Sequence, residues 1–182
     1  MEKFEQGTPN TMKEKIQAVW KKICAFFDTW YALFFAPLLV GCLYVSVLAM
    51  TGVAPFGDKY TAASYDLSAQ ICPFVEHLFD VFQGKSTLTY SYAIVGGADV
   101  TGTFLYFFIS PFSFLFLIFG DGKVAYASSI VMLCKLMAIA FAGAWFAKTQ
   151  FKSIPDYLCI AVGCVYAYCG YMFVGAPRDV WR

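Results

Sequence analysis

One segment of the chain carries polar side chains at spacings that suit chemistry. Asp66, Gln70 and His77 follow one another at intervals of four and seven residues, which on a helix of about 100° per residue places them within roughly 40° of one another. A carboxylate beside an amide and an imidazole can act as a general base, bind a cation, or hydrogen-bond a sugar or a phosphate. The alternative is that the three residues form only the solvated face of an amphipathic helix. Pro73 lies among them, and it either kinks this helix or separates two shorter ones.

Two further charged residues extend the set of candidates. Asp99 lies in a glycine-rich loop over residues 96–103, where the backbone can approach a ligand closely, although glycine and aspartate are also ordinary turn residues. Lys135 lies deep inside an otherwise apolar run, where an ammonium group is costly unless it is paired or hydrated. Its expected partner is Asp66, Asp99 or the phosphate of a lipid substrate, and the alternative is a structural buried ion pair.

The composition places these residues in a membrane protein. Of 182 residues, 60% are hydrophobic, 20% are aromatic and 14% are charged, and the mean hydropathy is +0.63, which is far more apolar than a soluble domain. Several runs approach the roughly 20 residues that a membrane-spanning helix needs. These features exclude a soluble enzyme, a disordered tail and a secreted disulfide scaffold. The net charge of +1 offers no basic surface for nucleic acid.

The seven cysteines are interpreted as small apolar residues. Their number is odd, most of them lie within apolar runs, and none forms a C-x-x-C pair, so neither a metal site nor a disulfide framework is expected. Only Cys72 lies in a polar segment. It is therefore the one cysteine that we expect to be an exposed thiol.

Hydropathy predicts an all-α integral membrane fold with three transmembrane helices in one membrane domain, residues 31–182. Residues 12–30 place apolar and lysine side chains at helical spacing, so the segment 1–30 is expected to be cytoplasmic and to lie on an anionic lipid surface. The spans are placed near 31–55, 124–147 and 154–175, and an outside loop over 56–123 carries interfacial helices near 61–83 and 101–120. Between these two helices we expect a turn, a short extended piece and the glycine-rich loop.

The apolar run 101–120 decides the topology. A spanning helix there would place Lys148 and Lys152 outside, whereas short re-entrant or interfacial helices, broken at Ser110-Pro111, keep both lysines inside with those of the N-terminus. The positive-inside rule favours the second arrangement. We therefore expect a multi-pass protein of the bacterial cell membrane with a cytoplasmic N-terminus.

The order and spacing of the polar residues resemble the N-terminal region of the bacterial YfhO family of membrane proteins. The resemblance extends from about Tyr31 to Phe173, and it includes a third-span segment over residues 167–173. It rests mainly on Asp66-x-x-x-Gln70-x-x-Pro73-Phe74-x-x-His77-Leu78, Gly84, Ser91-Tyr92, Gly96-Gly97-x-Asp99-x-x-Gly102-Thr103, Ser110-Pro111-Phe112 and Lys135.

The resemblance implies a GT-C-type membrane glycosyltransferase. Such enzymes take a sugar from a polyprenyl-phosphate carrier and transfer it, outside the cytoplasmic membrane, to envelope polymers such as teichoic acids. Asp66 matches the acidic residue of the first outside loop, which is expected to serve as catalytic base or to position the acceptor or a metal. Gln70 and His77 match its neighbours, and Asp99 lies where the family often has a polar or acidic residue, so we expect these three to bind substrate. Lys135 matches a lysine of the following span, which we assign to binding substrate through the carrier phosphate or to ion pairing with the loop. The class suggests a divalent cation as cofactor, with Asp66 and Asp99 as its candidate ligands.

Two other expectations accompany this interpretation. Family members are several times longer, and residues 175–182 do not resemble the continuation that they lead us to expect, so the chain is expected to be an N-terminal portion that is inactive alone. The rival interpretation is a small non-enzymatic membrane subunit, transporter-like or scaffolding, in which Lys135 and the loop carboxylates form a structural or ion-conducting network. Dependence on a lipid carrier would favour the enzyme, and a stable oligomer without it would favour the subunit.

The three-span topology predicts a distinct labelling pattern for single cysteines introduced into a cysteine-free background. Cysteines within 66–77 should react with a membrane-impermeant maleimide added outside the cell, whereas cysteines within 148–152 should react only after the membrane is opened. Labelling of residues 148–152 from outside would disprove this topology.

Overall fold

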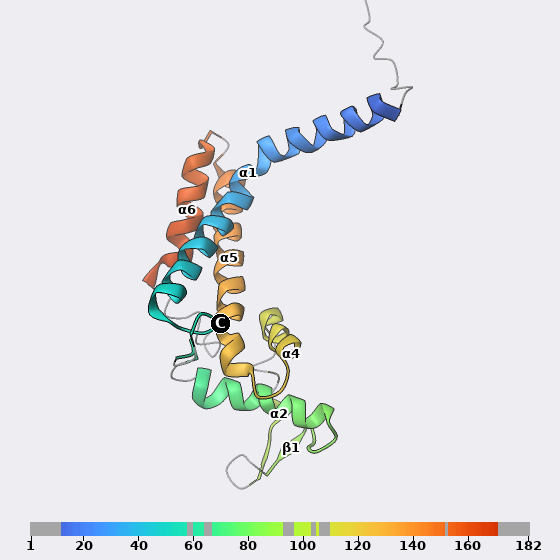
Figure 1. The fold of residues 1–182 in the computed structure, drawn as a ribbon, viewed down its shortest axis with the longest axis vertical. Helices are drawn as coiled ribbons and strands as arrows, with labels where there is room; N and C mark the ends of the chain where they lie inside the picture. The colour runs from blue at the N-terminus through green and yellow to red at the C-terminus, as the bar shows by residue number, and fades with distance from the viewer. Residues whose placement is uncertain are drawn as a thin grey trace, which may run out of the picture.

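The computed structural model describes residues 12–57, 60–63, 67–92, 97–102, 105, 110–151 and 153–170, and most of the described residues are helical (Figure 1). In chain order the elements are α1 (Met12–Thr51), the π-helical segment η1 (Leu67–Ile71), α2 (Cys72–Phe82), β1 (Tyr90–Ser91), β2 (Ala98–Asp99), the 3₁₀ segment η2 (Pro111–Leu115), α4 (Phe116–Phe119), α5 (Val124–Gln150) and α6 (Asp156–Tyr168).

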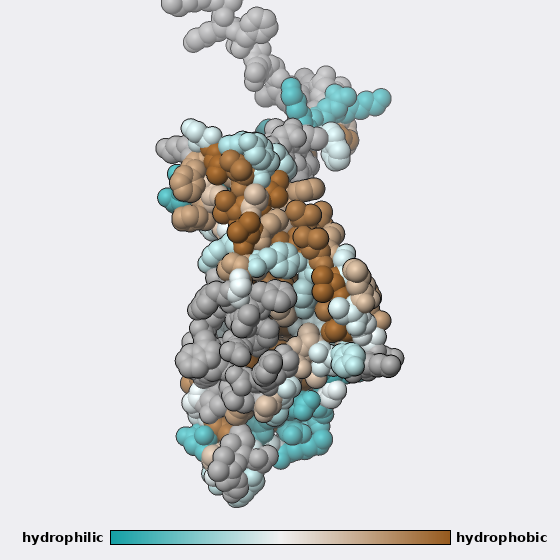
Figure 2. Space-filling view, turned by 90° about the vertical axis from the view of Figure 1, so that its left-hand side faces the viewer, coloured by the Kyte–Doolittle hydropathy of each residue, from teal (hydrophilic) through white to brown (hydrophobic). Residues whose placement is uncertain are grey.

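Three helices, α1, α5 and α6, lie side by side as a bundle (Figure 1). Trp30–Thr51 of α1, with 22 residues, and Val124–Gln150, with 27 residues, are long and apolar enough to cross a bilayer. They correspond to the spans expected near 31–55 and 124–147. The third expected span, near 154–175, contains the apolar helix α6, whose 13 described residues are fewer than a spanning helix needs. The last part of that expected span lies outside the described residues, so the third span stays a prediction. Apolar side chains gather over this bundle in the space-filling view (Figure 2).

The N-terminal amphipathic segment and the first span form one continuous helix. α1 runs for 40 residues from Met12 to Thr51, with Pro37 inside it. The sequence instead predicts two elements that meet near residue 30. They are continuous because the intervening residues contain neither proline nor glycine, and such residues are the usual local signals that end a helix.

Small residues allow the three helices of the bundle to approach closely. A Cβ atom added to Gly163 would lie 2.6 Å from the carbonyl oxygen of Ala140 and 3.1 Å from the Cβ of Ala36. One added to Gly143 would lie 3.2 Å from the Cα of Gly163. Because lipid tails are as apolar as the helices, such close van der Waals packing is a main source of association within a bilayer.

An ion pair between α5 and α6, together with a cation–π contact to α1, joins the three helices at one end of the bundle. The Lys148 Nζ lies 2.7 Å from the Asp156 Oδ1 and 5.7 Å from the centre of the Trp30 ring. Lys148 is in the last turn of α5 and Asp156 is in the first turn of α6, so both charges also complement the helix dipoles. We call this group of residues the clamp.

At the other end of α5 the remaining elements form a loop layer, defined as η1, α2, β1, β2, η2 and α4 (Figure 1). The helix predicted near 61–83 is present as η1 followed directly by α2, and Pro73 lies in the first turn of α2. A proline is tolerated there because its missing N–H would have no helical partner. Pro73 therefore marks the change from π- to α-helix and does not kink a single α-helix.

The rest of the layer contains a small hairpin and two short helical segments. β1 pairs with β2 in antiparallel register, with Tyr90 opposite Asp99, so the expected extended piece is one strand of a two-stranded sheet. Over the described part of 101–120, η2 and α4 together span nine residues, 111–119. Thr101, Gly102 and Leu105 of the same run are also helical, and most residues between them and η2 lie outside the described part, so the interfacial character of this run stays a prediction.

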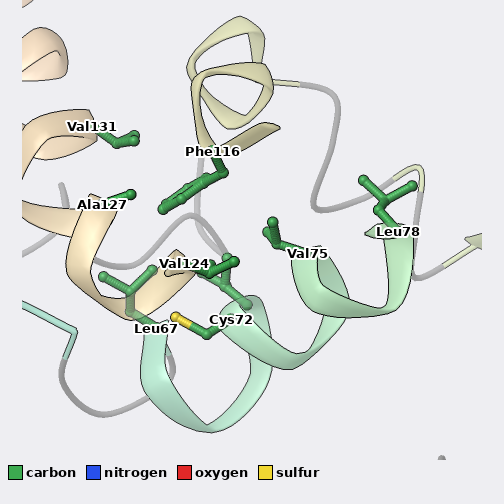
Figure 3. Close-up of a cluster of buried hydrophobic side chains, with 9 residues drawn as sticks. Leu67, Cys72, Val75, Leu78, Phe116, Val124, Ala127 and Val131 are labelled. Atoms are coloured by element: carbon green, nitrogen blue, oxygen red, sulfur yellow. The ribbon is translucent and has the colours of Figure 1, made fainter. Parts of the chain in front are cut away.

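A cluster of buried side chains attaches the loop layer to the first turns of α5 (Figure 3). Phe116 points from α4 towards Ala127 and Val131 of α5, and Val75 approaches it from α2. The cluster consists of Leu67, Ile71, Cys72, Val75, Leu78, Phe116, Val124, Ala127 and Val131.

The helix crossing at Gly163 predicts a measurable intolerance to a single methyl group. Gly163→Ala should destabilise the protein by about 1–3 kcal/mol, because the new Cβ would overlap the backbone of α5. Thermal unfolding in detergent would measure the change. Gly170→Ala is the matched control, because no atom of the described residues lies within 4 Å of its added Cβ. Equal stability of the two variants would contradict the close crossing.

Candidate functional site in the loop layer

His77 anchors the loop that follows α2. Its Nε2 lies 3.1 Å from the carbonyl oxygen of Thr87, and because a carbonyl can only accept, the Nε2–H donates. Thr87 in turn donates its hydroxyl to the carbonyl of Tyr90 at 2.8 Å and accepts the Tyr90 N–H at 3.3 Å. The imidazole predicted to bind substrate is therefore also the residue that positions the start of the hairpin.

Asp99 lies at the end of the same hairpin. It is exposed, it is opposite Tyr90 in the sheet register, and its Oδ1 accepts the backbone N–H of Thr101 at 2.9 Å. This hydrogen bond lowers the pKa of the Asp99 carboxyl below its ordinary value of 3.8. The carboxylate is therefore ionised at neutral pH. Asp99 is also linked to His77, because Tyr90 pairs with Asp99 across the sheet and is hydrogen-bonded to Thr87, which accepts the His77 N–H.

Two tyrosines of the hairpin form an exposed aromatic surface that sequence reasoning did not single out. The rings of Tyr90 and Tyr92 meet edge to face at a centroid distance of 5.0 Å. Gly97 has a φ of +124°, and a Cβ on it would collide with the Tyr90 hydroxyl. Gly97 of the glycine-rich loop is therefore needed so that the Tyr90 side chain can pack against the backbone there. The alternation Tyr-Ser-Tyr over 90–92 is the sequence signal that identifies the pair.

Lys135 lies on the face of α5 that continues into the loop layer. It is half-buried and takes part in an interaction with its surroundings. Val131, one turn earlier on the same face, belongs to the buried cluster of the loop layer. Helical side chains generally lean towards the N-terminus of their helix, and the loop layer lies at that end of α5. The Lys135 backbone lies about 20 Å along the helix from Lys148 of the clamp.

Of the predicted site residues, Asp66 is not described, and Gln70, within η1, is described only in its backbone. The π-helical turn of η1 has more residues per turn than an α-helix, so spacing at about 100° per residue does not hold through it. π-helical turns occur frequently at functional sites. The roles of Asp66 and Gln70 remain predictions.

The expected exposure of Cys72 is wrong. The side chain is 5% exposed and belongs to the buried cluster beneath α2. Burial, with a smaller contribution from the nearby Glu76 carboxylate, raises the pKa of the Cys72 thiol to about 11. The composition of the segment misled the prediction, because a helix with polar residues nearby in the sequence can still bury one of its side chains against a neighbouring element. Cys72 is a packing residue.

A metal centre is not assembled by the described part of the chain. Within it, no three His, Cys, Asp or Glu side chains are grouped so that they could hold an ion. Asp99 is the one described member of the two candidate ligands, and it already uses one oxygen for the Thr101 N–H. We therefore derive no chemical step through a metal.

A groove of about 460 Å³ lies on the bundle, away from the loop layer. It is lined by residues of α5 and α6 in the half of α5 that leads to the clamp: Ala142, Gly143, Phe146, Val162 and Tyr166. Its lining contains none of the predicted site residues.

Comparison with known proteins agrees with a membrane protein of bacteria. A family model described as bacterial membrane protein YfhO matches residues 33–181. Neither a curated protein nor a solved structure matches the chain. The matched range covers the loop layer, α5, α6 and most of the apolar part of α1.

The anchoring role of His77 predicts a local effect of its replacement. His77→Phe keeps a ring but removes the donor to Thr87, and the lost hydrogen bond is worth about 1 kcal/mol. Hydrogen exchange of residues 85–91 should therefore become about fivefold faster. Phe82→Ala, which alters an exposed side chain of the same helix, should leave this exchange unchanged. Unaltered exchange in the His77 variant would show that the loop is held by other contacts.

Proposed function

The chain belongs to the YfhO family of bacterial membrane proteins, and from that membership we propose that it is the N-terminal portion of a GT-C-type glycosyltransferase. Its donor is a polyprenyl-phosphate-linked sugar. Its acceptor is a cell-envelope polymer such as a teichoic acid, on the outer face of the membrane. The proposal rests on the resemblance of the polar loop residues and on their position relative to the apolar helices.

The observation that carries the proposal is the position of Lys135. If the clamp marks one edge of the roughly 30 Å hydrocarbon core, a residue about 20 Å further along α5 lies in the opposite third of it. A lysine there, if its stem leans towards the loop layer as helical side chains generally lean towards the helix N-terminus, can reach the boundary where the phosphate of a lipid-linked sugar resides. The sugar would then extend into the layer that contains His77 and Asp99.

We assign this layer to the outside of the cell from the distribution of lysines. The lysines at the start of α1 and Lys148 of the clamp lie at the same end of the bundle (Figure 1). The positive-inside rule assigns that end to the cytoplasm. The loop layer, at the opposite end of α5, is then extracytoplasmic, and α6 belongs to the proposed third span. This is the face on which lipid-linked sugars serve as donors in the proposed reaction.

In the proposed reaction the acceptor hydroxyl attacks the anomeric carbon of the donor sugar. Asp66 accepts the proton of that hydroxyl, a new glycosidic C–O bond forms, and the bond between the anomeric carbon and the phosphate oxygen breaks. Lys135 stabilises the negative charge that develops on the departing phosphate. Gln70, His77 and Asp99 hydrogen-bond the sugar and acceptor hydroxyls, and ionised Asp99 acts only as an acceptor.

The rival function, a non-enzymatic subunit, is favoured by the uncovered apolar surface of the bundle. The groove between α5 and α6 and the exposed apolar side chains of α1 leave surface that another transmembrane helix could cover. In that case Lys135 would belong to a structural network. Carrier dependence separates the two functions.

Transfer of labelled sugar from a polyprenyl-phosphate-linked hexose to envelope polymer, measured in membranes that contain the protein in its natural length, tests the proposal. Asp66→Asn should lower kcat by about 10²–10⁴-fold, the usual contribution of a general base. Lys135→Gln should lower kcat/KM for the donor, and Lys135→Arg, which keeps the charge, should restore part of it. Lys123→Gln is the control, because Lys123 is exposed and precedes α5.

The outcomes are separable. Full transfer by both the Asp66 and the Lys135 variants would refute the assigned roles. Absence of carrier-dependent transfer in the unaltered protein, together with a stable oligomer in detergent, would support the subunit instead.

A further inference from the structure

The first eleven residues of α1, 12–22, form a helix whose apolar side chains are exposed. Met12 is 77% exposed and Trp20 is 67% exposed, and Ile16 and Val19 are exposed as well. Figure 1 shows this part of α1 leaning away from the bundle. An isolated helix of this length is marginal in water, and large exposed apolar side chains indicate a surface that another apolar phase covers.

The arrangement of charges around these side chains identifies that phase. At about 100° per residue, the four apolar positions occupy one stripe roughly 100° wide. Lys13 and Lys15 lie about 80° to either side of its centre, and Lys22 lies about 105° from it. All three are exposed. Lysines that border an apolar stripe can extend their ammonium groups to phosphates while the stripe enters the acyl boundary.

Lys21 differs from the other lysines. It lies about 155° from the centre of the stripe, on the opposite side of the helix. It is exposed, as Trp20 and Lys22 beside it are. A flat anionic surface beneath the stripe would therefore contact Lys13, Lys15 and Lys22 more closely than Lys21.

We propose that residues 12–22 lie in the interface of the bilayer that α1 itself crosses, and that they bind anionic lipid headgroups there. The occupant of the apolar face is a bilayer surface because the helix continues directly into the apolar segment Trp30–Thr51. That continuity keeps the segment within one helix length of headgroups at all times, whereas a protein partner would have to be recruited. Phosphate groups supply the negative charge that the flanking lysines complement.

Hydrogen exchange of the full chain in lipid nanodiscs tests this assignment. In phosphatidylcholine mixed with anionic phosphatidylglycerol, the amides of residues 12–22 should exchange more slowly than in phosphatidylcholine alone, and added salt should reduce the difference. Lys15→Gln should speed exchange in the anionic nanodiscs by about fivefold, the factor that corresponds to one lysine near a charged surface. Lys21→Gln removes the same charge from the opposite side of the helix and should have little effect.

A second variant separates the apolar contribution from the charge. Trp20→Gln should speed exchange in both kinds of nanodisc, because it removes the largest side chain of the stripe. Equal protection of residues 12–22 in the two lipid mixtures, or equal effects of the Lys15 and Lys21 variants, would overturn the proposal. Protection that rises with protein concentration would overturn it as well, because the apolar face would then be covered by a second copy of the chain. None of these results depends on transferase activity.

Discussion

Burial of the Phe116 ring between α2 and α5 is the contact on which the rest of the structure depends. It joins α2, which ends at Phe82, to α4 and α5, which begin at Phe116 and Val124, and burying a phenylalanine contributes about 1.5–3 kcal/mol. In the proposed topology the loop layer lies outside the bilayer, and the hydrophobic effect in water would then drive this contact. Within the spans no such force exists, and the bundle is held by the close approach of Gly143, Gly163 and Ala140 and by the clamp. α5 takes part in both kinds of packing. The candidate site lies near its N-terminal part, next to the buried cluster and away from the glycine crossing.

The apolar spans and the loop helix could be predicted from the sequence because each is a local pattern. Hydropathy placed a span near 124–147 where α5 runs from Val124 to Gln150, and helical periodicity near 61–83 corresponds to η1 and α2, Leu67–Phe82. The single helix of residues 12–51 was predicted as two elements because the composition changes near residue 30 although the backbone continues. Pairing of β1 with β2 depends on a register that two residues per strand cannot specify.

The candidate site was predictable in its residue types more than in its contacts. Asp99 and His77 lie in one layer, as the loop pattern indicated, but the hydrogen bond from His77 to the Thr87 carbonyl involves a backbone group, which leaves no trace in the sequence. Cys72 shows the opposite error, since its polar neighbours concealed a buried position. Lys135 was identified from its apolar surroundings, and the structure adds that it follows Val131 of the buried cluster by one turn on the same side of α5.

The length of α5 connects the fold to the thickness of the membrane around it. Its 27 residues extend for about 40 Å, whereas the hydrocarbon core measures about 30 Å. If the clamp lies at one boundary, the first turn of α5, with Val124 and Ala127, lies beyond the other, whereas Val131 and Lys135 lie inside it. A thicker bilayer would then draw this turn into hydrocarbon, and a thinner one would bring Lys135 towards water. Hydrophobic mismatch would penalise both changes, so this placement predicts that the protein is matched to membranes in a narrow range of thickness.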